Sequence, residues 1–180
     1  PLRPMTAWTT PLQGPRRTLS TASDDMFCYQ CEQTDGGTGC TTVGICGKDP
    51  QTAALQDALV HAVKGIACWA NAARAAGVPE AKLADANLYT IESLFTTLTN
   101  VNFDPVAIHA HVHKALDLRD QVEALAKSKG AEAPDAPAAS WTPSDPSIEG
   151  IEAEAKSSLG VAGRVSKFGP DIAGVQEMIV

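Results

Sequence analysis

The stretch that decides the fold is residues 49–79, which read DPQTAALQDALVHAVKGIACWANAARAAGVP. Asp49 followed by Pro50 is a typical helix start, because the aspartate can accept hydrogen bonds from free N–H groups and a proline at the first helical position has no N–H to lose. Apolar residues then recur at steps of three and four, namely Leu55, Leu59, Val63, Ile66 and Ala70. Since Gly77 and Pro79 end this pattern, we expect one long helix here.

A second helix is predicted over about residues 82–100. Its apolar residues share one stripe, which we expect to pack into a core: Leu88, Ile91, Leu94, Phe95 and Leu98. Asn100 and Asn102 mark its end. The pattern is therefore typical of an amphipathic helix that packs against its neighbours.

A third helix is predicted from Asp104 and Pro105, which repeat the cap-and-proline start, to about Lys129, with Gly130 as its terminator. Its apolar side is expected to comprise Ala115, Leu118, Val122 and Leu125. Because short loops join three amphipathic helices and no stretch from 50 to 130 resembles a strand, residues 49–130 are predicted to form an up-down-up bundle.

The chain beyond this bundle divides into two parts. Residues 131–147, AEAPDAPAASWTPSDPS, are rich in proline and alanine and are predicted to be a linker or long crossover. Residues 148–180 are predicted to start a second helical unit, with one helix from Ile148 to Leu159 and another opening at Pro170. The expected fold class is therefore all-α, with a cysteine loop, a three-helix bundle and the start of a second helical unit.

Residues 1–25 have the composition of an organellar transit peptide. Arg3, Arg16 and Arg17 are the only charged residues before Asp24, and hydroxyl side chains are frequent. We expect import into a mitochondrion or chloroplast, followed by cleavage between Arg17 and Met26. The alternative is a leader without an address, which would leave the protein in the cytoplasm.

Charge and hydropathy argue against two classes of partner. The formal net charge is −7, whereas nucleic-acid binding requires a basic face. No apolar run approaches the roughly 18 residues that a membrane span needs. We therefore expect neither a nucleic-acid partner nor a membrane.

Four cysteines lie in residues 26–48, MFCYQCEQTDGGTGCTTVGICGK, which show neither helical nor strand periodicity and are predicted to form a loop. Their spacing is C-x2-C-x8-C-x5-C, from Cys28 and Cys31 to Cys40 and Cys46. Thiolates on an irregular loop can converge on one centre, and a glycine-rich backbone can approach that centre closely. The spacing favours an iron–sulfur cluster.

Other uses of these cysteines stay open. A structural zinc site with four cysteine ligands is the main alternative, although such sites usually have two tight cysteine pairs and only Cys28 and Cys31 are tight here. Disulfides come third, because organellar interiors are reducing. Cys68 stands alone in the first predicted helix, where a thiol most often serves as a small buried hydrophobe, and we leave it out of the site.

Histidines offer a weaker metal signal. His109 and His113 share a helix face four residues apart, while His111 points elsewhere. Without a carboxylate at helical offset or an H-E-x-x-H pattern, a solvated helix face is favoured over a metal site. His61 is likewise expected on the surface, and Phe27 and Tyr29 are expected to shield the cluster from water.

Several blocks of the chain resemble hybrid-cluster (prismane) proteins, the family that contains the hydroxylamine reductases. The first is residues 26–34, MFCYQCEQT, and Gly39-Cys40-Thr41 and residues 44–48, GICGK, follow it. Leu55-Gln56-Asp57 and residues 169–177, GPDIAGVQE, add to the likeness. Together the blocks extend over about residues 26–180.

This resemblance implies a redox function. Cys28, Cys31, Cys40 and Cys46 would ligate a [4Fe–4S] cluster that accepts electrons from a redox protein. Catalysis on a small nitrogen-oxide substrate would take place at a hybrid [4Fe-2O-2S] cluster, held by later α/β domains that this chain does not contain. Carbon monoxide dehydrogenases share the superfamily and are the enzyme alternative, although their cysteine spacings differ.

Overall fold

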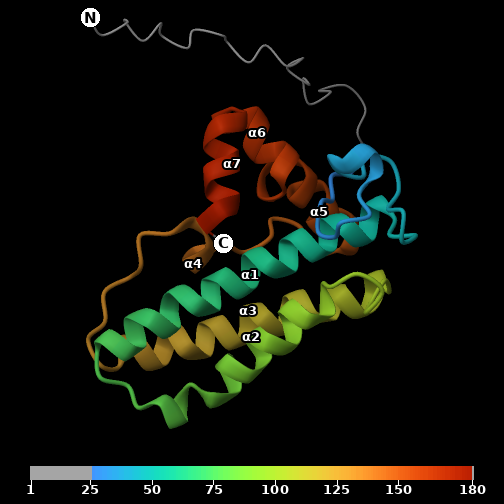
Figure 1. The fold of residues 1–180 in the computed structure, drawn as a ribbon. Helices are drawn as coiled ribbons and strands as arrows, with labels where there is room; N and C mark the ends of the chain where they lie inside the picture. The colour runs from blue at the N-terminus through green and yellow to red at the C-terminus, as the bar shows by residue number, and fades with distance from the viewer. Residues whose placement is uncertain (1–25, 180) are drawn as a thin grey trace, which may run out of the picture.

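The computed structural model describes residues 26–179, so the predicted leader, residues 1–25, lies outside the described part. Three long helices lie alongside one another: α1 (Pro50–Ala75), α2 (Ala84–Thr96) and α3 (Pro105–Lys127) (Figure 1). In the described residues the only β pairing is an isolated bridge between Cys28 and Cys40. The predicted all-α fold is confirmed. None of the described helices combines the length and apolarity that crossing a membrane requires.

Both predicted cap-and-proline starts are confirmed. The Asp49 carboxylate accepts a hydrogen bond from the Thr52 N–H at 2.6 Å, and the Asp104 carboxylate accepts from the N–H groups of Val106 and Ala107. These bonds satisfy donors that a helix cannot pair internally. Each helix therefore begins at the residue that the sequence indicated.

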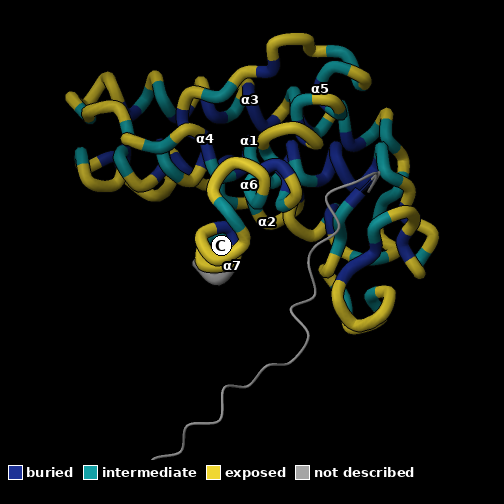
Figure 2. The backbone as a smooth tube through the Cα atoms, turned by 90° about the horizontal axis from the view of Figure 1, so that it is seen from above, coloured by how far each residue is buried: buried dark blue, intermediate teal, exposed yellow. Residues whose placement is uncertain are grey.

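Helix α1 is the centre of the packing. Leu55, Leu59 and Ile66 are at most 1% exposed, as the apolar period predicted. Alanines occupy much of the remaining surface and are buried too, and α2, α3, α4 and α5 all contact this helix. Buried residues accordingly gather along α1 in Figure 2, with exposed residues on the outer turns. A helix that is apolar on most sides is typical of a core element.

The predicted packing face of α2 is wrong. Its apolar stripe is exposed, with Ile91 67% and Phe95 59% exposed to solvent, whereas Ala86, Tyr89 and Ser93 are buried. The Tyr89 hydroxyl donates a hydrogen bond to the His111 carbonyl at 2.7 Å, which ties this face of α2 to α3. A short 3₁₀ turn, Glu80–Lys82, precedes the helix, so that α2 starts two residues later than predicted.

Helix α3 has roughly the predicted extent but a different buried side. Ala115 and Val122 are buried as expected, whereas Leu118 and Leu125 are only partly buried at the margin of the core. The most deeply buried side chains come earlier in the helix, at Ile108 and Val112. The face of α3 toward α1 is thus rotated from the predicted one.

The proline-rich segment 131–147 packs on α1. It includes the short helix α4 (Pro137–Ser140), whose Ala138 and Ala139 are buried. Trp69 on α1 donates its Nε1–H to the Ala139 carbonyl at 2.9 Å. A Cβ added at Gly65 would lie 2.4 Å from the Ala138 carbonyl oxygen, so the glycine is required for this close approach.

The predicted helix 148–159 is α-helical in its first part and π-helical in its second. Helix α5 (Ile148–Glu154) continues as a π-helical turn, Ala155–Leu159, and two further helices follow, α6 (Val161–Phe168) and α7 (Pro170–Ile179). The start of α7 at Pro170 was predicted, while α6 was not. At the end of the π turn, a Cβ added at Gly160 would lie 2.7 Å from an Asp57 carboxylate oxygen, so this glycine lets the second unit approach α1.

The two kinds of apolar position should differ in their effect on stability. We expect Leu59→Ala to lower the free energy of unfolding by about 2–5 kcal/mol, because it leaves a cavity in the core. The matched change Ile91→Ala should stay within about 0.5 kcal/mol, because its side chain is exposed. Urea unfolding monitored by circular dichroism measures both. Equal losses would show that α2 packs through its apolar stripe after all.

Candidate iron–sulfur site

The cysteine loop is anchored to the first turn of α1. Met26 and Cys40 pack with Ala53 of α1 in a small buried cluster, and Cys28 contacts its margin. In Figure 1 this loop lies at the amino end of α1, away from the α1–α2 turn. The start of the long helix therefore fixes where the loop sits.

Backbone hydrogen bonds hold the first and third cysteines side by side. The Cys28 N–H donates to the Cys40 carbonyl at 3.0 Å, and the Cys40 N–H donates to the Cys28 carbonyl at 2.7 Å. The Met26 N–H extends the pairing to the Thr41 carbonyl. The loop thus contains one short antiparallel bridge, and it brings together two cysteines that are far apart in the spacing pattern.

Two glycines permit the tight course of this loop. A Cβ added at Gly44 would lie 3.1 Å from the Cys46 sulfur and 3.2 Å from the Lys48 backbone nitrogen. At Gly39, an added Cβ would come within 2.7 Å of the Phe27 ring. Side chains at either position would displace a cysteine or its aromatic neighbour. At Gly44 the backbone thus passes close to one of the four thiols, while the expected approach of the glycine backbone to a bound centre stays a prediction.

The four loop cysteines are free thiols and provide an all-sulfur donor set. Cys40 is buried, and Cys28, Cys31 and Cys46 are partly buried. Cys68 lies apart, at the margin of the helical core, as expected for a packing residue. Thiolate is the ligand that iron–sulfur clusters use, so the donor chemistry of the loop fits such a cluster.

The four thiols are not gathered into a site for one metal ion. Among residues 26–179, no group of three or more His, Cys, Asp or Glu side chains is placed to hold one metal ion. This arrangement offers no preformed single-ion site.

The aromatic residues next to Cys28 differ in exposure. The Phe27 and Tyr29 rings pack against each other with centroids 5.7 Å apart, but Tyr29 is 44% exposed. Phe27, packed over Gly39, is the better placed of the two to exclude water.

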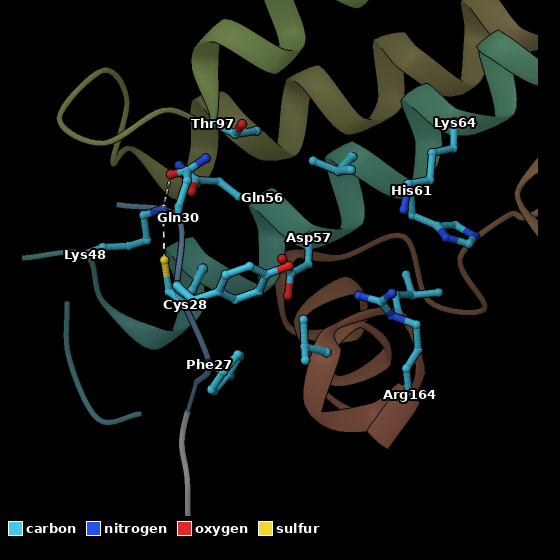
Figure 3. A pocket seen from close by; sticks show the side chains of 15 residues that line it. Phe27, Cys28, Gln30, Lys48, Gln56, Asp57, His61, Lys64, Thr97 and Arg164 are labelled. Carbon is cyan, nitrogen blue, oxygen red and sulfur yellow. Dashed lines mark hydrogen bonds between the residues drawn. The ribbon is translucent and has the colours of Figure 1, made fainter. Parts of the chain in front are cut away.

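A buried lysine accompanies the cysteines. Lys48 is 3% exposed, and its ammonium donates hydrogen bonds to the Cys28 sulfur at 3.9 Å and to Gln30 Oε1 at 3.3 Å (Figure 3). In the sequence Lys48 is only the last residue of the GICGK block, because a buried lysine has no pattern that distinguishes it from a surface one.

A cavity of about 230 Å³ opens beside Cys28. The cysteine loop forms one wall with Phe27 and Lys48, and α1 forms another. Several charged or polar side chains complete the lining, among them Gln56, Asp57, His61, Lys64, Thr97 and Arg164. The cavity is therefore lined by both polar and apolar side chains, and one cysteine of the loop faces it.

His61 is not the surface residue that the sequence suggested. Burial lowers its pKa to about 4, with the positive charges of Lys64 and Arg164 adding to the effect and the Glu154 carboxylate opposing it. The ring also packs edge-on against Trp141 at 5.3 Å. His61 is therefore neutral at physiological pH.

The predicted face-sharing of two histidines is confirmed. The Nε2 atoms of His109 and His113 are 3.1 Å apart, and both lie within hydrogen-bonding distance of the Pro146 carbonyl. His111 instead contacts Tyr89. The pair contacts the proline-rich segment, so this side of α3 is not simply a solvated face.

Comparison with known proteins identifies relatives of this chain. Residues 26–177 match the Prismane/CO dehydrogenase family. A hydroxylamine reductase of Syntrophobacter fumaroxidans is 44% identical over 130 residues, which is 72% of this chain and 23% of that protein. A hydroxylamine reductase of Burkholderia lata is 42% identical over 164 residues, which is 86% of this chain and 29% of that protein. The chain thus spans less than a third of the length of these relatives.

The partial burial of His61 should appear in the pH dependence of stability. The unfolded imidazole, with a pKa near 6.5, binds a proton that the folded ring, with a pKa of about 4, does not bind. The contribution of neutral His61 to the free energy of unfolding is therefore fully present above pH 6.5. It should be lost as the pH drops toward 4, by roughly 1–2 kcal/mol for this partly exposed ring. His61→Gln should flatten this slope in urea unfolding at several pH values. An unchanged slope would show that His61 is accessible to protons.

Proposed function

The chain belongs to the Prismane/CO dehydrogenase family, and on this basis we propose that it is the electron-entry part of a hydroxylamine reductase-like oxidoreductase. In this proposal Cys28, Cys31, Cys40 and Cys46 hold a [4Fe–4S] cluster. The observation that carries it is the set of four free thiols on one loop, anchored at the amino end of α1. The names of the relatives at 44% and 42% identity support the reductase class over carbon monoxide oxidation.

In this proposal the four cysteines would supply one thiolate ligand to each iron, in surroundings that are partly buried. When bound, a four-iron cluster supplies one-electron transfer, with each iron closed by sulfur. Cys40 and its neighbours Met26 and Ala53 exclude water on the α1 side. A shell with no open ligand position suits electron relay and gives a substrate no place to bind.

We place the chemistry on substrate outside residues 1–180. Reduction of an N–O bond requires an open metal position with proton donors nearby. In the proposed full-length protein a redox partner would be oxidised and its electrons would pass through the cysteine loop to a later domain. A hybrid [4Fe-2O-2S] cluster held there would supply the chemistry for reducing a small nitrogen oxide, with protons from nearby acids. The basic leader supports an organellar location for this reaction.

Ligand substitutions test the assignment of the four cysteines. We expect Ser in place of Cys28, Cys31, Cys40 or Cys46 to abolish the four-iron cluster, because each iron needs one protein ligand and a hydroxyl is a poorer donor than a thiolate. The matched control Cys68→Ser should retain it. Iron and sulfide analysis with EPR after anaerobic reconstitution measures both. A colourless protein that binds one zinc would contradict the proposal, and equal loss at Cys68 would contradict the ligand set.

Turnover separates electron relay from catalysis. We expect the reconstituted chain to be reduced by dithionite and reoxidised in single-electron steps, yet to produce no ammonia from hydroxylamine with reduced viologen. A full-length relative such as the Burkholderia lata protein provides the positive control. Ammonia formation by this chain at a rate near that of the control would place the catalytic site within residues 1–180.

A further inference from the structure

Lys48 is a cation buried beside the cysteine loop. Its ammonium lies 3.9 Å from the Cys28 sulfur and 3.3 Å from Gln30 Oε1, and the ring centroid of Phe103 is 5.8 Å away. Figure 3 shows the side chain directed at Cys28, with dashed lines to that sulfur and to Gln30. Lysine is seldom this deeply buried unless a negative charge faces it, because burying an unpaired ammonium is costly.

Among the described residues, the side-chain contacts of Lys48 with Cys28, Gln30 and Phe103 include no carboxylate. Within residues 26–179, the ion pairs that form do not include Lys48. Gln30 is a neutral amide and Phe103 a neutral ring, so each offers only partial charge. Cys28 can carry a full negative charge, as a thiolate bound to metal.

Lys48 is held in place both through its backbone and through its ammonium group. The Lys48 carbonyl accepts a hydrogen bond from the Gly44 N–H at 2.8 Å, which holds the backbone against the cysteine turn. Asp49, the next residue, caps α1. At the far end, Gln30 and Phe103 hold the charged group. A preorganised charge of this kind keeps its distance from Cys28 as the charge on sulfur changes.

We propose that Lys48 is a positioning residue for charge, one that raises the reduction potential of the cluster bound through Cys28. This inference rests on the proposed function. Reduction transfers one electron from the donor to the cluster and makes it more negative by one unit. A fixed positive charge beside a ligand sulfur stabilises the reduced form more than the oxidised form, so it favours electron uptake.

Redox titration of the reconstituted full chain, followed by EPR, tests the inference. Lys48→Met should lower the equilibrium constant for one-electron reduction at least tenfold, a shift of about 59 mV to more negative potential. Lys48→Gln should act in the same direction, and Lys48→Arg should retain most of the potential. Lys64→Met is the matched control, because Lys64 lines the same cavity further along α1 (Figure 3). Iron and sulfide contents are measured in each variant.

The outcomes separate this inference from the proposed function. A Lys48→Met variant with a full cluster and an unchanged potential overturns the inference alone, as does an equal shift in Lys64→Met. If Lys48→Met loses the cluster, Lys48→Gln is compared with Lys48→Arg, and equal potentials in these two variants overturn the inference. If both neutral variants lose the cluster while Lys48→Arg keeps the wild-type potential, Lys48 acts in cluster assembly, and the proposed role in the potential is overturned. A wild-type chain without a four-iron cluster overturns both proposals.

Discussion

The close packing that small side chains allow along α1 is the constraint on which the rest of the structure depends. Alanines on this helix are buried on several sides, and Gly65 lets the backbone of α4 approach to a distance that no Cβ would permit. Helices α2 to α5 and the proline-rich segment therefore take their positions from one surface. The cysteine loop does the same, because Ala53 in the first turn of α1 packs against Met26 and Cys40. The core and the candidate site thus share one support.

Local signals in the sequence predicted helix positions well and helix orientations less well. The starts at Asp49 and Asp104 follow from cap chemistry, which involves only residues within one turn. The face that α2 presents depends instead on Tyr89, whose hydroxyl finds its acceptor on α3. The spacing of apolar residues carries no information about that long-range hydrogen bond. It therefore predicted that the apolar stripe of α2 packs into the core, although this stripe is exposed. The π turn after α5, which contacts α1, was not predicted either, since periodicity does not distinguish a π turn from an α-helix.

At the candidate site, too, the sequence predicted local features but not those that depend on distant segments. Cysteine spacing identified the four thiols, since a dense set of thiols in a glycine-rich loop has few other uses. Lys48 and His61 were not identified as parts of the surroundings, because each contacts an aromatic ring of a distant segment, Phe103 for Lys48 and Trp141 for His61. Titratable residues become informative only when the fold shows what covers them.

The direction of α1 adds an electrostatic effect that belongs to no side chain. Its 26 residues run away from the cysteine loop, so the positive end of the aligned peptide dipoles, equivalent to about half a unit charge, lies at the loop. This field is part of the backbone and persists in every point variant that leaves the helix intact. Two sources of positive potential therefore act on the loop, the Lys48 ammonium, which a substitution can remove, and the α1 dipole, which it cannot. The dipole is a property of the same helix that organises the fold.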